Sequence, residues 1–239
     1  MPSALEWRSS PTVELIDWMP RVGATGDERV VQAARVSSGT EDRGTEAANR
    51  GLLRMLMRDR HGSPVEHVVF TWRIETHLGV SREFFRHRIA SYNETSTRYR
   101  VMEPVFYVPP PDRPLVQVGK PGAYSFERGT KEQYEIMVEA RKSAAEVCWH
   151  DYQEQLDAGI AREVARDVLP LSLFTSFYVT MNLRSFSNFT SLRWAHPAAK
   201  VPTFPLWEIE QVAIRMEWDV LAIAPQIMQH FNSFGRRPV

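Results

Sequence analysis

A short stretch of the chain carries most of the side chains that are suited to bind an anion. Residues 82–100 hold five Arg against two Glu, and three basic residues stand in a row at Arg86, His87 and Arg88. Arg binds phosphate and carboxylate through paired N–H donors, and aromatic side chains next to the row offer faces for a ring. The stretch therefore predicts a binding site for phosphorylated ligands that contain a ring.

Polar residues suited to hydrogen bonding follow this row, at Ser91, Asn93, Glu94, Ser96 and Arg98. Such residues are common in simple turns, but Glu94 among Arg side chains can also accept from a ribose hydroxyl or orient a guanidinium. Ser96 is better explained as a ligand contact than as a nucleophile, because a serine nucleophile needs an adjacent base and the chain has no G-x-S-x-G motif. The alternative for the whole stretch is an exposed basic helix face that binds nothing.

The remaining candidates for chemistry are few. The seven His show no metal-binding spacing such as H-E-x-x-H, so we expect no metal site. The only cysteine, Cys148, is expected to be a buried small side chain on a long helix rather than a nucleophile. The chain has no G-x-G-x-x-G motif and no P-loop, which leaves the Arg-rich stretch as the expected binding site for phosphates.

The composition is that of an ordinary soluble protein. With 239 residues, of which 43% are hydrophobic and 24% charged, the chain is long enough for a sizeable core. A net charge of zero argues against a general nucleic-acid binder, although 25 of the 29 basic residues are Arg, which either anion binding or a GC-rich genome would explain. No apolar run reaches the roughly 20 residues of a membrane helix and no secretory signal is visible. We therefore expect a cytoplasmic protein.

The pattern of apolar residues predicts an α+β fold, in which a small, mostly antiparallel sheet is flanked by helices. Alternation predicts strands over residues 13–18, 65–76, 105–108 and 171–181. Helices are predicted over residues 27–35, 45–60, 125–159, 160–168, 182–194 and 207–230. Asp27 and Asn182 are the expected N-caps of two of them.

A central helix is predicted to carry the basic row, since it starts near Gly79 and runs to about Ala90. On such a helix Arg86 and Arg88 would point about 200° apart, so each would bind a different anion. We expect one domain over residues 1–239, with flexible tails at residues 1–11 and 232–239.

Four segments, in order along the chain, resemble motifs of the flavin-dependent thymidylate synthases. Residues 86–96 match the signature R-H-R-x7-S. Residues 61–67 resemble H-x-[ST]-P-F-E-H, residues 162–171 resemble R-E-x-A-R…L-P, and residues 182–193 resemble N-x-R-S…N-F…L-R. The resemblance covers most of residues 30–220.

This resemblance implies an α/β homotetramer whose active sites are shared between subunits. It implies conversion of dUMP to dTMP, with FAD as cofactor, 5,10-methylenetetrahydrofolate as carbon donor, NADPH as reductant, and no nucleophile from the enzyme. That last point fits a chain whose only cysteine lies outside every motif. No nucleic-acid or membrane partner is implied.

The resemblance also implies site residues. FAD contacts are implied for Ser37, Ser63, Arg86, His87, Arg88, Ile89, Asn93, Glu94, Asn182, Leu183, Arg184 and Asn188. Contacts with dUMP are implied for Glu83, Phe84, Phe85, Arg86, Glu94, Thr95, Ser96, Thr97, Arg98, Arg166 and Arg193. Arg193 is the implied catalytic residue, which would pair with the uracil edge and stabilise charge as N3 ionises, since Arg cannot act as a base.

Two departures from the family pattern leave other functions open. Glu83 stands where the family commonly has Gln, and a longer loop that contains His196 follows Arg193. A flavin-binding relative that oxidises NADPH without methylating would explain both departures. An RNA-binding module built on the Arg and aromatic residues is the alternative from a different class, although no RNA-binding signature is present.

Overall fold

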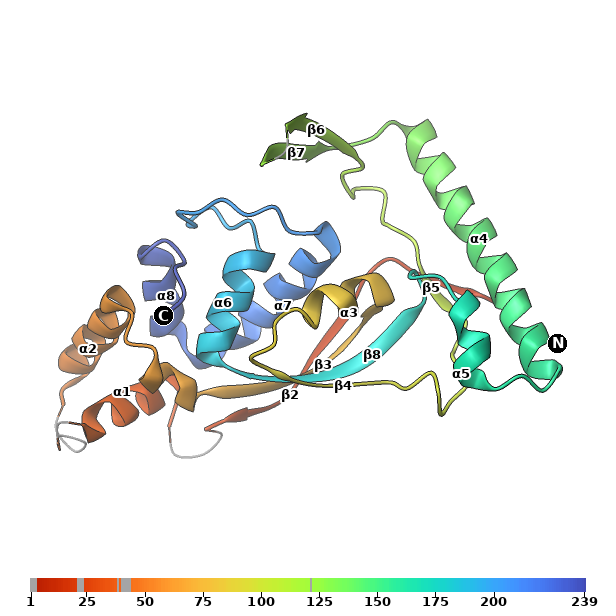
Figure 1. Ribbon diagram of the computed structural model, residues 1–239. Coiled ribbons are helices and arrows are strands. Elements are labelled where there is room, and N and C mark those ends of the chain that lie inside the picture. The colour runs from red at the N-terminus through yellow and green to blue at the C-terminus, as the bar shows by residue number, and fades with distance from the viewer. Residues whose placement is uncertain (1–3, 21–23, 38, 40–43, 121) are drawn as a thin grey trace. The chain divides into compact units, whose positions relative to one another are not determined.

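The computed structural model describes residues 4–20, 24–37, 39, 44–120 and 122–239, and it contains both helices and small sheets (Figure 1). The largest sheet has four strands in the order β2 (Thr12–Met19), β3 (Val69–His77), β8 (Phe174–Asn182) and β4 (Ser91–Glu94). β3 and β8 run antiparallel, because Leu183 N–H donates to Val68 O while Leu78 N–H donates to Leu173 O. Mixed helices with small antiparallel sheets confirm the predicted fold class.

Strand β3 shows the predicted alternation of its side chains. Phe70, Trp72 and Ile74 are fully buried, whereas Thr71 and Arg73 on the other face are only half-buried. A period of two places successive side chains on opposite faces of a strand. The apolar residues of this strand therefore lie on the face that packs in the core.

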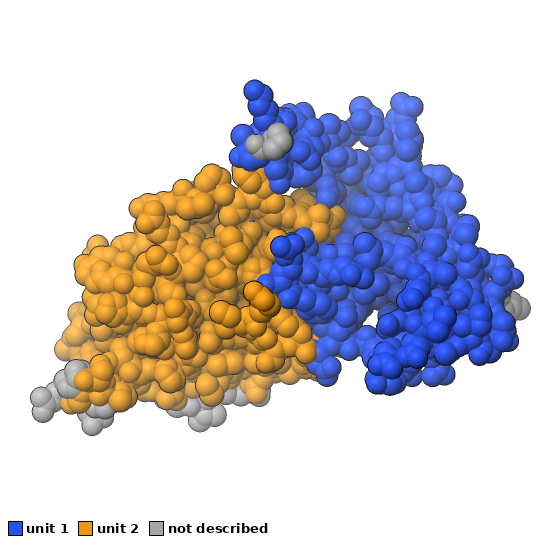
Figure 2. All heavy atoms as spheres, viewed as in Figure 1, with its two compact units in different colours: residues 1–12, 74–86, 93–177 blue, residues 13–73, 87–92, 178–239 orange. Residues whose placement is uncertain are grey.

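The chain forms two compact units, each assembled from three segments (Figure 2). Unit 1 comprises residues 1–12, 74–86 and 93–177, and unit 2 comprises residues 13–73, 87–92 and 178–239. The chain therefore crosses from one unit to the other twice inside the predicted binding stretch, after Arg86 and after Tyr92. The prediction of a single domain over residues 1–239 stays a prediction.

Unit 2 is mainly helical. Its helices are α1 (Gly26–Val36), α2 (Glu46–Asp59), α6 (Leu183–Arg193), α7 (Trp207–Ile223) and α8 (Pro225–Ser233), with a 3-10 helix, η1, at Ser63–His67. Asn182 caps α6 as predicted, since its side chain accepts from Ser185 N–H. Phe186, Phe189, Val212 and Met216 are fully buried, which places α6 and α7 in the core of this unit.

The prediction for Asp27 is wrong in an informative way. Thr25, not Asp27, caps α1, because the Thr25 hydroxyl accepts from Glu28 N–H and the Glu28 side chain accepts from Thr25 N–H. Asp27 is buried and accepts instead from the N–H groups of Gln226 and Ile227, at 2.9 and 3.0 Å. These are donors in the first turn of α8, so Asp27 caps a helix that lies 200 positions away in the sequence.

The predicted last helix is two helices. α7 ends at Ile223 and α8 starts at Pro225. Proline lacks the N–H that would continue a helix and clashes with the preceding turn, yet its fixed φ suits a first helical position. Pro225 therefore ends one helix and begins the next.

Unit 1 combines a long helix with short strands. Its elements are α3 (Leu78–Phe84), α4 (Lys131–Asp157), α5 (Arg162–Ala165), a 3-10 turn at Arg166–Val168, and strands β1 (Glu6–Arg8), β5 (Val105–Tyr107), β6 (Val116–Lys120) and β7 (Ala123–Glu127). α4 starts later than predicted, because β6 and β7 form an antiparallel hairpin and Thr130 with Gln133 makes a capping box. Trp149 and Tyr152 of α4 are buried in the core of this unit with Phe106, whereas Cys148 is only half-buried.

The central helix is shorter than predicted. α3 ends at Phe84, and the chain then leads into β4, whose continuation at Thr95 N–H donates to Ser176 O. Phe84 and Phe85 both pack edge-on against Phe177, at 5.3 and 5.5 Å between ring centroids. The basic row therefore lies in the irregular connection between α3 and β4, and the 200° separation expected of Arg86 and Arg88 on a helix does not apply.

Both predicted tails contain ordered structure. β1 pairs in parallel with β5, and near the other end Arg236 and Val239 are only 2% and 7% exposed. The expectation of flexible ends stays a prediction, although these residues take part in regular structure or are buried. Within the described part of the chain, no helix is long and apolar enough to cross a membrane.

Candidate active site

The three residues of the basic row differ in exposure, and the imidazole ring of the middle one is held by its neighbours. Arg86 and Arg88 are exposed, whereas His87 is half-buried. The His87 ring packs edge-on against Phe189 of α6 at 4.9 Å, and the hydroxyl of Tyr92 donates to the His87 carbonyl at 2.9 Å. Burial raises the pKa of Tyr92 to about 12, so this hydroxyl stays a donor at neutral pH.

Arg193, the last residue of α6, contacts this fixed ring. Its Nε donates to His87 Nε2 at 3.0 Å. Because an Arg nitrogen only donates, Nε2 of His87 must accept, and a neutral His87 ring therefore carries its proton on Nδ1. The predicted catalytic residue and the middle residue of the basic row thus meet across 106 positions of sequence.

Predicted substrate residues gather in unit 1 around α5. Arg166 Nη1 donates to Thr97 Oγ1 at 2.7 Å, and Arg98 Nε donates to Glu163 at 2.8 Å. Arg162 Nη1 reaches the Tyr99 carbonyl at 3.4 Å. The loop after β4 and the segment around α5 therefore form one cluster with several guanidinium donors, a chemistry suited to phosphate. The sequence had not singled out Glu163, although it stands inside the R-E-x-A-R segment.

Glu94 and Ser96 also belong to unit 1, and their side chains make different hydrogen bonds. Glu94 is half-buried and accepts from Thr175 Oγ1 of β8 at 3.0 Å. Ser96 Oγ accepts from Arg98 N–H at 3.3 Å, and among the described residues no His or carboxylate hydrogen-bonds to it. A nucleophilic serine needs such a base, so the geometry agrees with a ligand contact or turn residue.

The start of α6 is held by polar contacts within unit 2. Arg184 Nε donates to the Val239 carbonyl at 2.8 Å, and its Nη1 pairs with Glu66. A Cβ on Gly62 would lie 2.7 Å from Arg184 Nε, so only glycine leaves room for this arrangement. Two of the motif segments, residues 61–67 and 182–193, therefore meet through Arg184.

The other predicted flavin residues of unit 2 differ in exposure. Ser63 and Asn188 are exposed, and Ile89 is 78% exposed. Ser37 is exposed, and its hydroxyl donates to the Ala34 carbonyl at 3.0 Å. Leu183 is fully buried, as is Phe84 in unit 1. Neither of these two residues therefore presents an exposed atom to a ligand.

A buried ion pair that the sequence did not reveal supports the end of α6. Glu217 and Arg236 are both fully buried in their side chains and are joined by hydrogen bonds, and each also bonds to Thr190 of α6. The Arg236 guanidinium lies 4.9 Å from the centre of the Trp194 ring, directly after Arg193. Separation of this pair would leave an uncompensated buried charge, which is strongly destabilising, so this network holds in place the helix that carries Arg193.

His196 lies next to this network. Its ring meets Trp194 edge-on at 4.5 Å, and its Nδ1 accepts from Ala198 N–H. Burial and the Arg236 charge lower the pKa of His196, so the ring is neutral near pH 7.

The predicted residues divide by ligand. Apart from Arg193, every residue implied to contact dUMP belongs to unit 1, and apart from Arg86, Asn93 and Glu94, every residue implied to contact FAD belongs to unit 2. The chain passes from unit 1 to unit 2 after Arg86 and returns to unit 1 after Tyr92, and most residues implied for FAD and for dUMP fall on different sides of these boundaries. The R-H-R-x7-S segment thus contributes to both units.

The chain is similar to known proteins along most of its length. Residues 14–226 match a family model described as thymidylate synthase complementing protein. A flavin-dependent thymidylate synthase from Streptomyces avermitilis is 46% identical over 236 residues, which is 96% of this chain and 94% of that protein. The chain belongs to the flavin-dependent thymidylate synthase family.

Further known proteins are similar over nearly the whole of this chain. The enzyme from Streptomyces coelicolor is 45% identical over 97% of this chain and 95% of its own. A UMP/dUMP methylase, PolB from Streptomyces cacaoi, solved with 5-Br dUMP, has a TM-score of 0.91 at 42% identity and covers 98% of this chain and all of its own. Its structure with 5-Br UMP gives a TM-score of 0.89 at 41% identity, over 98% of this chain and 99% of its own.

Proposed function

We propose that this chain converts dUMP to dTMP, with FAD as cofactor, 5,10-methylenetetrahydrofolate as carbon donor and NADPH as reductant. Family membership supports the proposal, and the observation that carries it is the contact between Arg193 and His87. That contact joins the implied catalytic residue to the R-H-R row. It has no evident purpose in a basic face that binds nothing.

The donor set of the chain suits FAD. Arg86 and Arg88 are exposed, and their forked N–H groups match the oxygens of a pyrophosphate. Ser63 and Asn188 add exposed polar groups from neighbouring motifs. When bound, FAD supplies the redox chemistry, and the protein supplies position and electrostatics.

The residues around α5 are assigned to the nucleotide. Arg98 and Arg166 carry the positive charge for its phosphate, and Ser96 and Thr97 offer hydroxyls beside them. Glu163 holds the Arg98 side chain in place. This set binds and orients dUMP without providing a nucleophile.

Arg193 is assigned the activating role. Its charge stabilises the negative charge that develops on the uracil ring when N3 ionises, and the bond to His87 fixes the plane of its guanidinium in advance. Donors that are already oriented toward developing charge lower a barrier without reorganisation. Arg193 does not move a proton in this scheme.

A second candidate is methylation of UMP as well as dUMP. It is favoured by the two solved structures of the UMP/dUMP methylase PolB, with 5-Br UMP and 5-Br dUMP. Rates measured on both nucleotides by one preparation separate a dUMP-specific enzyme from one that accepts both.

The main test is the visible absorbance spectrum of the purified protein, recorded while dUMP is titrated in. Purified protein is expected to show the visible absorbance of a flavin, and that absorbance is expected to change as dUMP is titrated in. Protein that stays colourless and takes up no FAD would refute the proposal. RNA binding that is steeply salt-dependent and not displaced by dUMP would favour the RNA-binding alternative.

Release of tritium from 5-tritiated dUMP tests methylation itself. We expect release that depends on NADPH and on 5,10-methylenetetrahydrofolate. Flavin reduction by NADPH without release of tritium would support the alternative of a flavin-binding relative that oxidises NADPH but does not methylate.

We further propose that the enzyme is a cytoplasmic homotetramer.

A further inference from the structure

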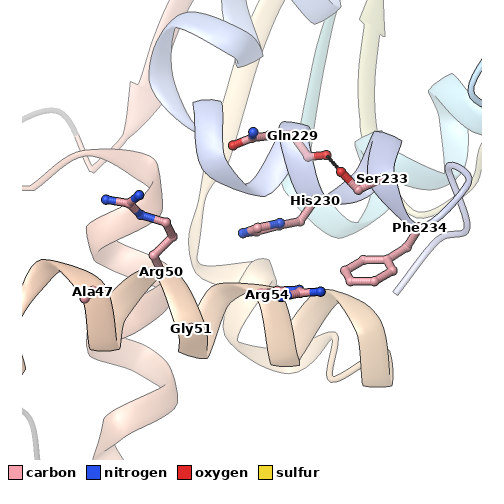
Figure 3. Close-up of a pocket in the computed structure, with 8 residues that line it drawn as sticks. All are labelled: Ala47, Arg50, Gly51, Arg54, Gln229, His230, Ser233 and Phe234. Carbon is pink, nitrogen blue, oxygen red and sulfur yellow. Dashed lines mark hydrogen bonds between the residues drawn. The ribbon is translucent and has the colours of Figure 1, made fainter.

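A pocket outside all of the motif segments lies in unit 2 where α2 meets α8 (Figure 3). Its volume is about 620 Å³, within the range of small-molecule sites. It is lined by four residues of α2, which are Ala47, Arg50, Gly51 and Arg54, and by Gln229, His230, Ser233 and Phe234 at α8. None of these residues is among those implied to bind FAD or dUMP.

The lining of this α2–α8 pocket is cationic. It contains two Arg and one His, and it contains no carboxylate. Glu46, outside the lining, pairs with Arg50 at 2.8 Å. For Arg54, in contrast, the structure gives no hydrogen bond or ion pair among the residues it describes. The field in the pocket therefore favours an anion.

His230 supplies the second observation. Its ring extends from α8 toward α2 (Figure 3), and its Nε2 is buried with no hydrogen-bond partner among the described residues. A buried polar atom without a partner is costly, so this nitrogen needs a hydrogen-bonding partner such as a water or a bound group. Burial and the Arg54 charge lower the pKa of His230, so the neutral ring is available to donate from Nε2.

The rest of the pocket suits a ring. Phe234 lies 6.4 Å from His230 between ring centroids, with a tilt of 32°. Ser233 Oγ donates to the Gln229 carbonyl, which leaves its lone pairs to accept. A Cβ on Gly51 would meet no atom within 4 Å, so the floor of the pocket is open.

We propose that the α2–α8 pocket binds a nucleoside monophosphate. Arg54 and His230 hold its phosphate, with Arg50 at the edge, and Phe234 covers its base. More than two converging donors match the three terminal oxygens of a phosphate better than the two of a carboxylate. This site goes beyond the proposed function and does not depend on it.

Titration calorimetry on the full protein tests the site, with FAD and dUMP both saturating so that their sites are filled. The probes are AMP, inorganic phosphate and adenosine. We expect saturable AMP binding, weaker phosphate binding and no detectable binding of adenosine. Absence of AMP binding under these conditions would overturn the proposal, as would phosphate that binds as tightly as AMP.

Two matched pairs of variants locate the binding. Arg54→Gln is expected to weaken AMP binding about tenfold or more, whereas Arg58→Gln, one turn further along α2 and already held by Asp59, is expected to leave it unchanged. Gly51→Phe is expected to abolish binding by filling the floor, and Gly51→Ala to preserve it. Unchanged AMP affinity in Arg54→Gln or in Gly51→Phe would refute the assignment. Turnover of dUMP is measured on the same variants, so a failure of the proposed function is seen separately.

Discussion

At the scale of single residues, the chemistry rests on how neighbours fix a side chain. His87 is held by Phe189 through its ring and by Tyr92 through its carbonyl, and it accepts from Arg193. A side chain whose orientation is set before a ligand arrives loses little entropy on binding. The position of Arg193 is therefore decided by residues that are remote in the sequence.

Replacement of Arg193 by Ala should leave the flavin bound and remove turnover. Loss of one oriented donor typically costs on the order of 100-fold or more in rate, and the exposed Arg86 and Arg88 remain for FAD. Visible absorbance and tritium release, measured on one preparation, check both halves of the prediction. Arg237→Ala, which removes an exposed Arg of the same unit, is the control. Normal turnover in Arg193→Ala would contradict the assigned role.

His230 should make the protein less stable as the pH falls below 6.5. Its pKa in the folded state is lowered by burial and by Arg54, so below 6.5 the unfolded chain binds a proton that the folded chain does not. The free energy of unfolding then decreases with falling pH, by well under about 1 kcal/mol because the ring is partly solvated. Urea unfolding at pH 7.5 and 5.5 should show a larger decrease for the native chain than for His230→Gln.

The same comparison removes the background from His196, whose pKa is also lowered and which titrates equally in both proteins. Saturating AMP should reduce the difference, because a bound phosphate stabilises the protonated ring. An identical pH dependence in both proteins would show that His230 keeps its ordinary pKa.

At the scale of elements, helix ends are satisfied by residues from other helices. α8 has no side-chain cap of its own, since Ala224 precedes Pro225. Asp27 of α1 supplies that cap, although burial raises its pKa. The bonds tie the start of α1 to the start of α8 and so fix one wall of the α2–α8 pocket.

Removal of this cap should destabilise α8 in particular. Asp27→Ala leaves two buried N–H groups without an acceptor and should cost about 1–2 kcal/mol of stability. Hydrogen exchange is the suitable measurement, and the amides of Gln226 and Ile227 should lose protection first. Gln32→Ala, on the exposed side of α1, is the control. Equal protection of α8 in Asp27→Ala and the native chain would mean that the cap contributes nothing.

At the scale of the whole molecule, the two ligand sets follow the two compact units. Residues implied for dUMP fall mainly in unit 1, and residues implied for FAD fall mainly in unit 2. The long helix α4 of unit 1 buries only three residues, Ala145, Trp149 and Tyr152, and leaves Ile136 and Val147 63% and 58% exposed. Large exposed apolar patches mark surfaces that another chain covers, whereas single exposed apolar residues are common on monomers, so the oligomeric state has to be measured.

We expect the purified protein to have about four times the mass of its 27.6 kDa chain. Light scattering coupled to size exclusion measures this directly. The double variant Ile136→Glu, Val147→Glu places two charges on the exposed apolar residues of α4 and should lower the mass, whereas Glu146→Gln on the same helix should not. A native chain that elutes as a monomer would contradict the proposed homotetramer.

The sequence by itself determined the fold class, most of the elements and the family. Alternation located β3, the Asn182 cap placed the start of α6, and the motif spacing selected Arg86 to Ser96 and Arg193. These features are local, because they depend on the period of a strand, the chemistry of a cap or residues at fixed separations. The prediction from the sequence is wrong at the start of α1, where both Thr25 and Asp27 are suitable N-caps. It also places helix ends wrongly where the apolar pattern continues beyond the last helical residue, as after Phe84 and before Pro225.

Only the tertiary structure decided which distant residues meet. The Arg193–His87 bond, the Glu217–Arg236 pair and the Asp27 cap join residues that lie 106, 19 and about 200 positions apart. Each depends on how helices pack, which the pattern of a single segment does not contain. The same holds for the α2–α8 pocket, since its two walls are ordinary amphipathic helices in the sequence. Their packing leaves Arg54 without a carboxylate and His230 Nε2 without a partner among the described residues.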